Sequence, residues 1–229
     1  MVVEFPWEIE RIELSQTVRF GGRSEAYSDH EGKQRRRWVS THDVLAIPYD
    51  VPVPGYRNDI VNTLRLWSAA ATDEFDLDEF NAGDYADAVA AKNEAENITM
   101  VLYPNAATES GQELRLRQQY FLVSASLQDV LRDWRQRHGD EYSGLAEKLC
   151  VQLNDTHPAL AVPELMRLLM DHCYLSWNEA WDITSQTMAY TNHTLLPEAL
   201  EQWPVTMFES LLPRLLEIIY EINARFIQH

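Results

Sequence analysis

Three groups of polar residues each follow a short apolar run, and their side chains are of types that suit chemistry. They are Tyr103-Pro104-Asn105, Asn154-Asp155-Thr156-His157-Pro158 and Tyr190-Thr191-Asn192-His193-Thr194. Functional groups often lie at the carboxyl ends of buried strands, and amide, hydroxyl and carboxylate groups suit hydrogen bonds to sugar hydroxyls in a cleft. The same residue types form turns and helix caps, which is the more common role of each group taken alone.

Other kinds of chemistry find less support in the sequence. A small hydrolase built on Asp155, His157 and His193 would need a nucleophile or a third metal ligand, and neither a serine elbow nor a metal-ligand spacing occurs. Cys150 and Cys173 lie among apolar residues and are not spaced like zinc ligands or a disulfide framework. We therefore expect no metal site, and a reducing, cytoplasmic location.

The charge of the chain argues against two classes of partner. Its 229 residues carry 36 acidic and 19 basic side chains, for a net charge of −17, which would repel nucleic acid and anionic lipid. The one basic run, Lys33 to Arg37, fits a solvated hairpin tip, with anion binding as the alternative. The N-terminus lacks the features of a signal peptide, and no apolar stretch is long enough to span a membrane.

The elements that must position the polar groups fall into two sections. Residues 1–80 are rich in β-branched and aromatic residues and predict antiparallel strands near 12–20, 37–47 and 61–68, with the proline-rich stretch 48–56 as an extended loop between strands. Residues 81–229 follow a helical period. The fold class is therefore mixed α/β, with a strand-rich first third followed by helices and short buried strands.

Within the second section, the apolar run 149–153 predicts a buried strand followed by a turn and a helix opened by Pro163 and Glu164. Further helices are expected at the four ranges 84–97, 112–138, 177–187 and 206–228. Asp84 is the expected cap of the first of these, and Ser176 with Glu179 forms a capping box for the third. The last helix has no stop signal, so we expect both sections to belong to one larger domain that is truncated at each end.

Several long sequence blocks closely resemble the glycogen, starch and maltodextrin phosphorylase family. The blocks are Pro48–Arg57, Asn62–Ser68, Val151–Pro158, Pro163–Arg167, Ala189–Thr194 and Pro197–Glu201. The resemblance implies a part of a two-domain glycosyltransferase-type phosphorylase fold, taken from its N-terminal half. It also implies reversible phosphorolysis of an α-1,4-glucan to glucose 1-phosphate, with pyridoxal phosphate as the cofactor of the full-length enzyme.

The resemblance implies a role for four residues of this chain. His193 matches a histidine against the bound glucose, Asp155 and His157 match positions near the acceptor cleft, and Asn105 matches a loop asparagine that contacts glucose. We therefore expect His193 and Asp155 in catalysis, and Asn105, His157 and His193 in substrate binding. The family loop continues from the asparagine with polar residues, whereas this chain has Ala106-Ala107, which puts the gating role of the loop in doubt.

The resemblance also bears on regulation and partners. The helix at 84–97 matches the tower helix, which packs on its twofold mate and couples the dimer interface to the loop that follows. Arg132-Asp133 stands where nucleotide-activated members carry two adjacent arginines for the phosphate of AMP, so activation by that route is not expected. The expected partners are thus α-1,4-glucan, phosphate and a second copy of the chain.

Cofactor binding is not expected within these residues. Lys33, Lys92 and Lys148 are the only lysines, and all lie in charged or polar stretches unsuited to imine chemistry. We therefore expect residues 1–229 alone to be inactive. The alternative is a stand-alone carbohydrate-binding or dimerisation module without catalysis.

Overall fold

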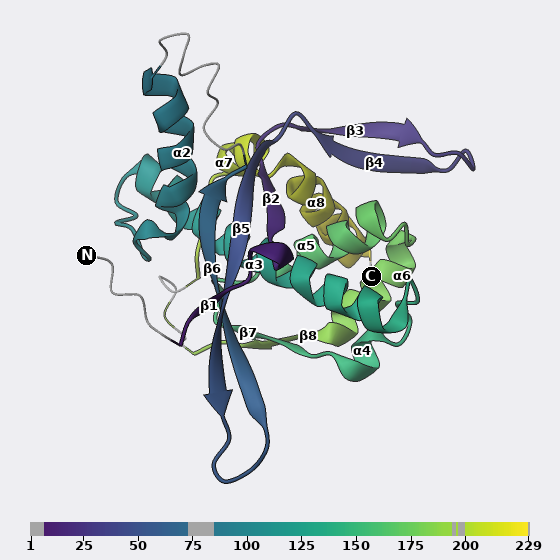
Figure 1. Ribbon diagram of the computed structural model, residues 1–229. Coiled ribbons are helices and arrows are strands. Elements are labelled where there is room, and N and C mark those ends of the chain that lie inside the picture. The colour runs from purple at the N-terminus through teal and green to yellow at the C-terminus, as the bar shows by residue number, and fades with distance from the viewer. Residues whose placement is uncertain (1–6, 73–84, 194–195, 197–199, 229) are drawn as a thin grey trace. The chain divides into compact units, whose positions relative to one another are not determined.

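A computed structural model describes residues 7–72, 85–193, 196 and 200–228. They form two compact units that are not consecutive in sequence. The first consists of described residues within Met1–Val18 and Asp43–Ala125, and the second of those within Arg19–His42 and Ser126–His229. Strand-rich antiparallel sheets come first along the chain and helices follow, so the predicted mixed α/β class is confirmed (Figure 1).

The first unit is built on an antiparallel sheet. Its strands are β1 (Ile9–Glu10), β2 (Gln16–Phe20), β5 (His42–Pro54) and β6 (Val61–Ala71). The order is β1-β5-β2, and β6 also pairs with β5. The expected strand at 12–20 is partly wrong, because Ile12–Leu14 forms a 3-10 turn. The Ser15 hydroxyl donates to the Ile12 carbonyl at 2.7 Å, a local bond that competes with strand pairing.

We predicted a loop for the proline-rich stretch 48–56, but most of it forms the second half of β5. Arg11 N donates to Pro48 O at 2.9 Å. The even-numbered residues of β5 therefore direct their backbone N–H and C=O groups away from β6. Pro52 and Pro54 are among them and pair in register with Thr63 and Val61. The hydrogen bonds that prolines cannot donate are therefore not required by the β5–β6 ladder, which explains why this stretch is tolerated in a strand.

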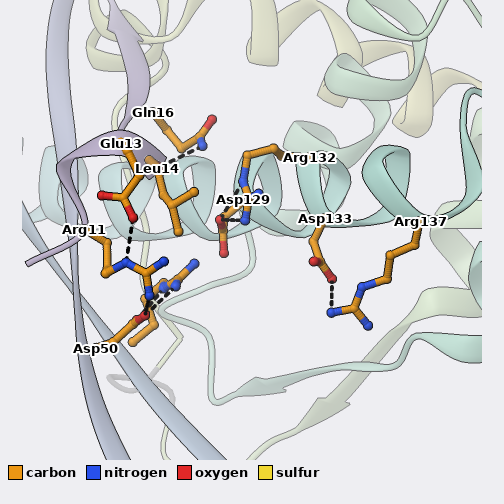
Figure 2. Close-up of polar contacts among 10 residues, drawn as sticks. Arg11, Glu13, Leu14, Gln16, Asp50, Asp129, Arg132, Asp133 and Arg137 are labelled. Carbon is orange, nitrogen blue, oxygen red and sulfur yellow. Dashed lines mark hydrogen bonds and ion pairs between the residues drawn. The ribbon is translucent and has the colours of Figure 1, made fainter. Parts of the chain in front are cut away.

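A buried carboxylate fastens the middle of β5. Asp50 is 7% exposed and receives Arg65 Nε and Nη2 from β6, each at 2.7 Å. Arg11 reaches the same carboxylate at 3.5 Å and also bonds Glu13 at 2.7 Å, as Figure 2 shows. The Arg65 hydrogen bonds hold the pKa of Asp50 below its usual value.

Among the described residues, two helices complete the first unit and lead out of it. They are α2 (Tyr85–Met100) and α3 (Glu109–His138), of which α3 continues into the second unit. The helix expected at 84–97 is observed as α2. Ala95 and Ile98 are buried, and Thr99 Oγ1 accepts a hydrogen bond from Ala69 N of β6 at 3.0 Å. The later turns of α2 thus pack on the sheet, whereas the expected cap, Asp84, lies outside the described residues.

In the second unit, β3 (Arg23–Ser28) and β4 (Gln34–Val39) form an antiparallel hairpin. The single strand predicted at 37–47 is therefore two strands, β4 and β5, separated at Ser40, whose φ is 55°. Gly22 also has a positive φ of 68°, and a side chain there would collide with the Val39 carbonyl. The turn into β3 thus requires glycine.

The helical part of the second unit packs around a leucine-rich core. Its elements are α4 (Leu145–Lys148), β7 (Val151–Asn154), α5 (Ala161–Arg167), a π-helical turn (Leu168–His172), α6 (Trp177–Thr187), β8 (Met188–Thr191), α7 (Val205–Leu211) and α8 (Pro213–Gln228). The core side chains share exposures of 2% or less and include Leu145, Leu165, Leu168, Leu169, Leu212 and Leu215.

One predicted helix boundary is confirmed and one predicted helix is wrong. Ser176 and Glu179 form the expected capping box at the start of α6. The helix predicted at 206–228 is broken into α7 and α8 at Leu212, whose φ of −135° and ψ of 51° are not helical. The reason is Pro213, because a proline disfavours helical geometry in the residue before it and suits the first position of a new helix.

Candidate functional site

Two of the three polar groups meet at the carboxyl ends of a parallel strand pair. β7 and β8 run side by side (Figure 1), with Leu153 opposite Tyr190 and Asn154 opposite Thr191. Leu153 is buried, whereas Gln152 and Asn154 lie on the other face and are exposed. Since both strands end at the same edge, the residues that follow them are brought together.

Hydrogen bonds join the two groups at this edge. His193 Nε2 lies 2.5 Å from Asn154 Oδ1, and the Asp155 backbone N–H donates to the Thr191 carbonyl at 2.9 Å. Gln152 Nε2 also donates to Thr191 Oγ1 at 2.9 Å. If the imidazole donates from Nε2, Nδ1 is left as an acceptor, and the edge presents an acceptor beside amide and hydroxyl groups, a set that suits a ligand rich in hydroxyls.

Asp155 is held in an uncommon conformation directly after β7. Its φ is 65°, in the left-handed region where only glycine, asparagine and aspartate are found with any regularity. Its Oδ1 accepts from the Thr156 backbone N–H at 2.9 Å. The side chain is therefore bonded to the loop backbone, and this bond fixes the direction of the carboxylate.

His157 lies in the same loop and faces an acidic residue that the sequence reasoning missed. Its Nδ1 is 3.3 Å from Glu201 Oε2, and the side chain of Glu201 is 14% exposed. A proton on the imidazole would turn this contact into an ion pair. Glu201 belongs to one of the blocks that resemble phosphorylases, but nothing in its spacing linked it to His157.

Asn105 lies in the first unit, in the loop between α2 and α3. Its side chain is exposed, and its Oδ1 accepts from the Ala107 backbone N–H at 3.0 Å. Its amide nitrogen is thus the donor that it can offer to a ligand. Thr194 and residues 197–199, which belong to the sequence blocks described above, lie outside the described residues.

The two residues at the expected nucleotide position are both held in ion pairs along α3. Figure 2 shows Arg132 turned back onto Asp129, at 2.8 Å, and Asp133 paired with Arg137, at 3.1 Å. Arg132 and Arg137 are therefore each already paired with a carboxylate. Asp133 adds a negative charge where a phosphate would need positive charge.

The basic run in the β3–β4 hairpin is also neutralised by nearby acids. Lys33 pairs with Glu31, Arg35 with Asp29, Arg36 with Glu217 and Arg37 with Glu25, at distances between 2.7 and 3.6 Å. This pattern supports the solvated hairpin over an anion site.

The described residues also include two cysteines, several potential metal ligands and three lysines. Cys150 and Cys173 are free thiols, and burial raises the pKa of the Cys173 thiol, which disfavours a nucleophilic thiolate. Among the described residues, no group of three or more His, Cys, Asp or Glu side chains could hold a metal ion. Lys33, Lys92 and Lys148 are all exposed, so they do not fit a pyridoxal phosphate site.

In the part of the chain that the structure describes, no helix has the length and apolar character required to cross a bilayer.

Comparison with known proteins identifies the family. The sequence profile of the carbohydrate phosphorylases matches residues 1–229. The chain is 54% identical to the muscle form of mouse (Mus musculus) glycogen phosphorylase, and 53% identical to the human (Homo sapiens) muscle form and the bovine (Bos taurus) brain form. These alignments cover 97% to 98% of this chain but only 27% of each relative. The chain belongs to the carbohydrate phosphorylase family.

Proposed function

We propose that residues 1–229 are part of an α-1,4-glucan phosphorylase, which transfers a terminal glucosyl unit of glycogen or maltodextrin to phosphate and releases glucose 1-phosphate. The observation that carries the proposal is the junction of Asn154 and His193 at the ends of β7 and β8, in a chain 53% to 54% identical to glycogen phosphorylases. The chain spans only 27% of those relatives, so we propose that residues 1–229 alone are inactive.

Within that enzyme, this chain contributes residues to the sugar site. His193, oriented by Asn154, lies against the glucosyl unit and accepts or donates a hydrogen bond to its hydroxyls. Asp155 and His157 line the adjoining acceptor cleft, where the bond from Thr156 N and the contact with Glu201 orient them. His193 and Asp155 are the two residues proposed to act nearest the transferred unit. Asn105 contributes its amide donor from a separate loop.

The remaining chemistry is supplied from outside these residues. Pyridoxal phosphate, when bound to the complete enzyme, supplies a phosphate group for proton transfer, and its lysine lies elsewhere because the three lysines here are exposed. We propose a cytoplasmic homodimer in which α2, the helix that resembles the family's tower helix, meets the second subunit. Neither nucleic acid nor a membrane is a proposed partner.

The test is an assay of glucose 1-phosphate formation from maltoheptaose and phosphate, with pyridoxal phosphate present. The complete polypeptide that contains this chain should be active, and residues 1–229 alone should not. Asn154→Ala should reduce the activity of the complete polypeptide about tenfold or more, because it removes the group that orients His193. Robust activity from residues 1–229, or none from the complete polypeptide, would overturn the proposal.

The ion pairs of α3 add an expectation about regulation. AMP should leave the rate of the complete polypeptide unchanged, since Arg132 is engaged by Asp129 and Asp133 repels phosphate. Activation by AMP, measured in the same assay, would contradict this reading of the site.

A further inference from the structure

The loop that carries Asn105, residues 101–108, has little apolar anchoring of its own. Val101, Leu102 and Tyr103 are 66%, 60% and 67% exposed. Tyr103 also has a φ of 55°, a strained conformation for a bulky residue that persists only where the surroundings hold it. The conformation of this loop must therefore depend on polar contacts.

Those contacts come from one face of α3. Gln118 Nε2 donates to the Val101 carbonyl at 2.7 Å, and Gln112 Nε2 donates to the Ala106 carbonyl at 3.1 Å. Between them along the helix, the Arg115 guanidinium lies 5.2 Å from the centroid of the Tyr103 ring. The three residues are spaced three apart, so they lie on the same side of the helix. They contact the loop near its start at Val101, in its middle at Tyr103 and near its end at Ala106.

The start of α3 brings the loop backbone close to the helix. Thr108 caps the helix, with its Oγ1 accepting from Gly111 N at 3.1 Å. A side chain at position 111 would collide with the Asn105 carbonyl, so only glycine permits this approach. Gly111 thus allows the Asn105 backbone to lie against the helix, and Ala107 N holds the Asn105 side chain.

We propose that Gln112, Arg115 and Gln118 are positioning residues that latch loop 101–108 and thereby set Asn105 for contact with the sugar. This inference rests on the proposed function for its consequence in catalysis, but the latch itself is a property of the first unit. The latch also explains why alanine is tolerated at positions 106 and 107. Ala106 accepts a hydrogen bond through its carbonyl and Ala107 donates one through its N–H, so neither needs a polar side chain.

Gln118 is the principal member of the latch. It is 6% exposed, and its removal would leave the Val101 carbonyl without this donor in a part-buried position. An unmade hydrogen bond of that kind weakens a local structure by about one order of magnitude in its opening equilibrium.

Hydrogen exchange of the complete polypeptide tests the latch directly. Gln118→Leu should speed exchange in the peptide covering residues 101–108 about tenfold, while the peptides of β7 and β8 are unchanged. Gln136→Leu is the matched control, an exposed glutamine on the last turns of the same helix, and should leave exchange in the loop unchanged. Unchanged exchange of residues 101–108 in Gln118→Leu would overturn the latch.

Gln112→Leu provides a second variant at a less buried position and should have the same effect at the Ala106 end. Equal loop exchange in Gln112→Leu and wild type would show that the Ala106 contact plays no part.

Kinetics separate positioning from a merely structural effect. Gln118→Leu should raise KM for glucose 1-phosphate about tenfold and leave kcat within about twofold, matching Asn105→Ala, because the loss is one of sugar binding. A fall in kcat with KM unchanged would mean that the variant only reduces the folded fraction, and would refute the positioning role. If the wild-type polypeptide makes no glucose 1-phosphate, the proposed function fails, and the exchange experiment still decides whether the latch exists.

Discussion

Replacing Arg167 by methionine should strongly destabilise the second unit, because it removes one partner of a buried ion pair. The side chains of Arg167 and Glu164 are 3% and 0% exposed. Arg167 Nε and Nη2 bond the two carboxylate oxygens at 2.7 and 2.8 Å, and its guanidinium lies 5.6 Å from the centroid of the Trp38 ring. A further contact joins Nη1 to His172 Nε2 at 3.1 Å.

The size of the effect follows from this burial. Removing one partner of a buried ion pair costs about 3 to 5 kcal/mol, since the remaining charge keeps its desolvation penalty. That loss is a large share of the roughly 5 to 15 kcal/mol by which a folded domain is stable. Replacing both partners by apolar residues of similar volume is often close to neutral. Glu164→Leu combined with Arg167→Met should therefore recover most of the stability lost by Arg167→Met alone.

Urea unfolding followed by circular dichroism measures these free energies. Arg137→Met is the control, because it breaks a helical ion pair whose side chains are 69% and 42% exposed and should cost less than about 0.5 kcal/mol. A loss below about 1 kcal/mol for Arg167→Met, or a double variant no more stable than the single one, would refute the argument that the remaining buried carboxylate destabilises the fold.

Three further effects follow from single contacts. Arg65→Ala should lower stability at neutral pH, and its deficit should shrink as pH falls below 3.8; acid titration of unfolding checks this. The reason is that the lowered pKa of Asp50 contributes its full stability above 3.8 and loses it as the pH falls through the folded-state pKa. Ser176→Ala removes the cap that bonds Glu179 N and should cost about 1 kcal/mol in urea unfolding. Partial desolvation and the neighbouring Arg167 guanidinium lower the pKa of His172 from 6.5 to about 4. The residue is partly exposed, so stability should fall modestly as pH drops from 6.5 toward 4, and His172→Gln should flatten that part of the pH profile.

Local signals in the sequence predicted local structure well. The Ser176 and Glu179 capping box marked the start of α6 correctly because its geometry is contained within four residues. The same kind of signal is present at Pro213, but the apolar period that continues smoothly across α7 and α8 obscures it. The error at the proline-rich stretch has a different origin, because whether a proline breaks a strand depends on which neighbour its nitrogen faces, and this is a tertiary property.

The members of the candidate site were proposed from the sequence, whereas their contacts could not be predicted from it. The spacing of the polar groups and the resemblance pointed to Asn105, Asp155, His157 and His193, but the bond from Asn154 to His193 depends on the register of β7 on β8. Parallel strands joined by a long crossover carry no register signal in the sequence, unlike a hairpin.

The link of His157 to Glu201 was missed for a related reason. The two residues are brought together by the fold across a long stretch of chain, and nothing local to either residue announces the contact.

Pro52 and Pro54 both direct their backbone nitrogens away from β6, and this has a consequence for self-association. Among the described residues, β1 pairs with β5 at Tyr49 and Asp50, and Pro52 and Pro54, which follow along the same edge of β5, are exposed. An incoming strand at that edge would find no amide donors at either position. A neighbouring chain therefore cannot readily add a strand to β5 on this side, which protects the sheet against edge-to-edge aggregation. The hydrogen bonds between β5 and β6 are not affected.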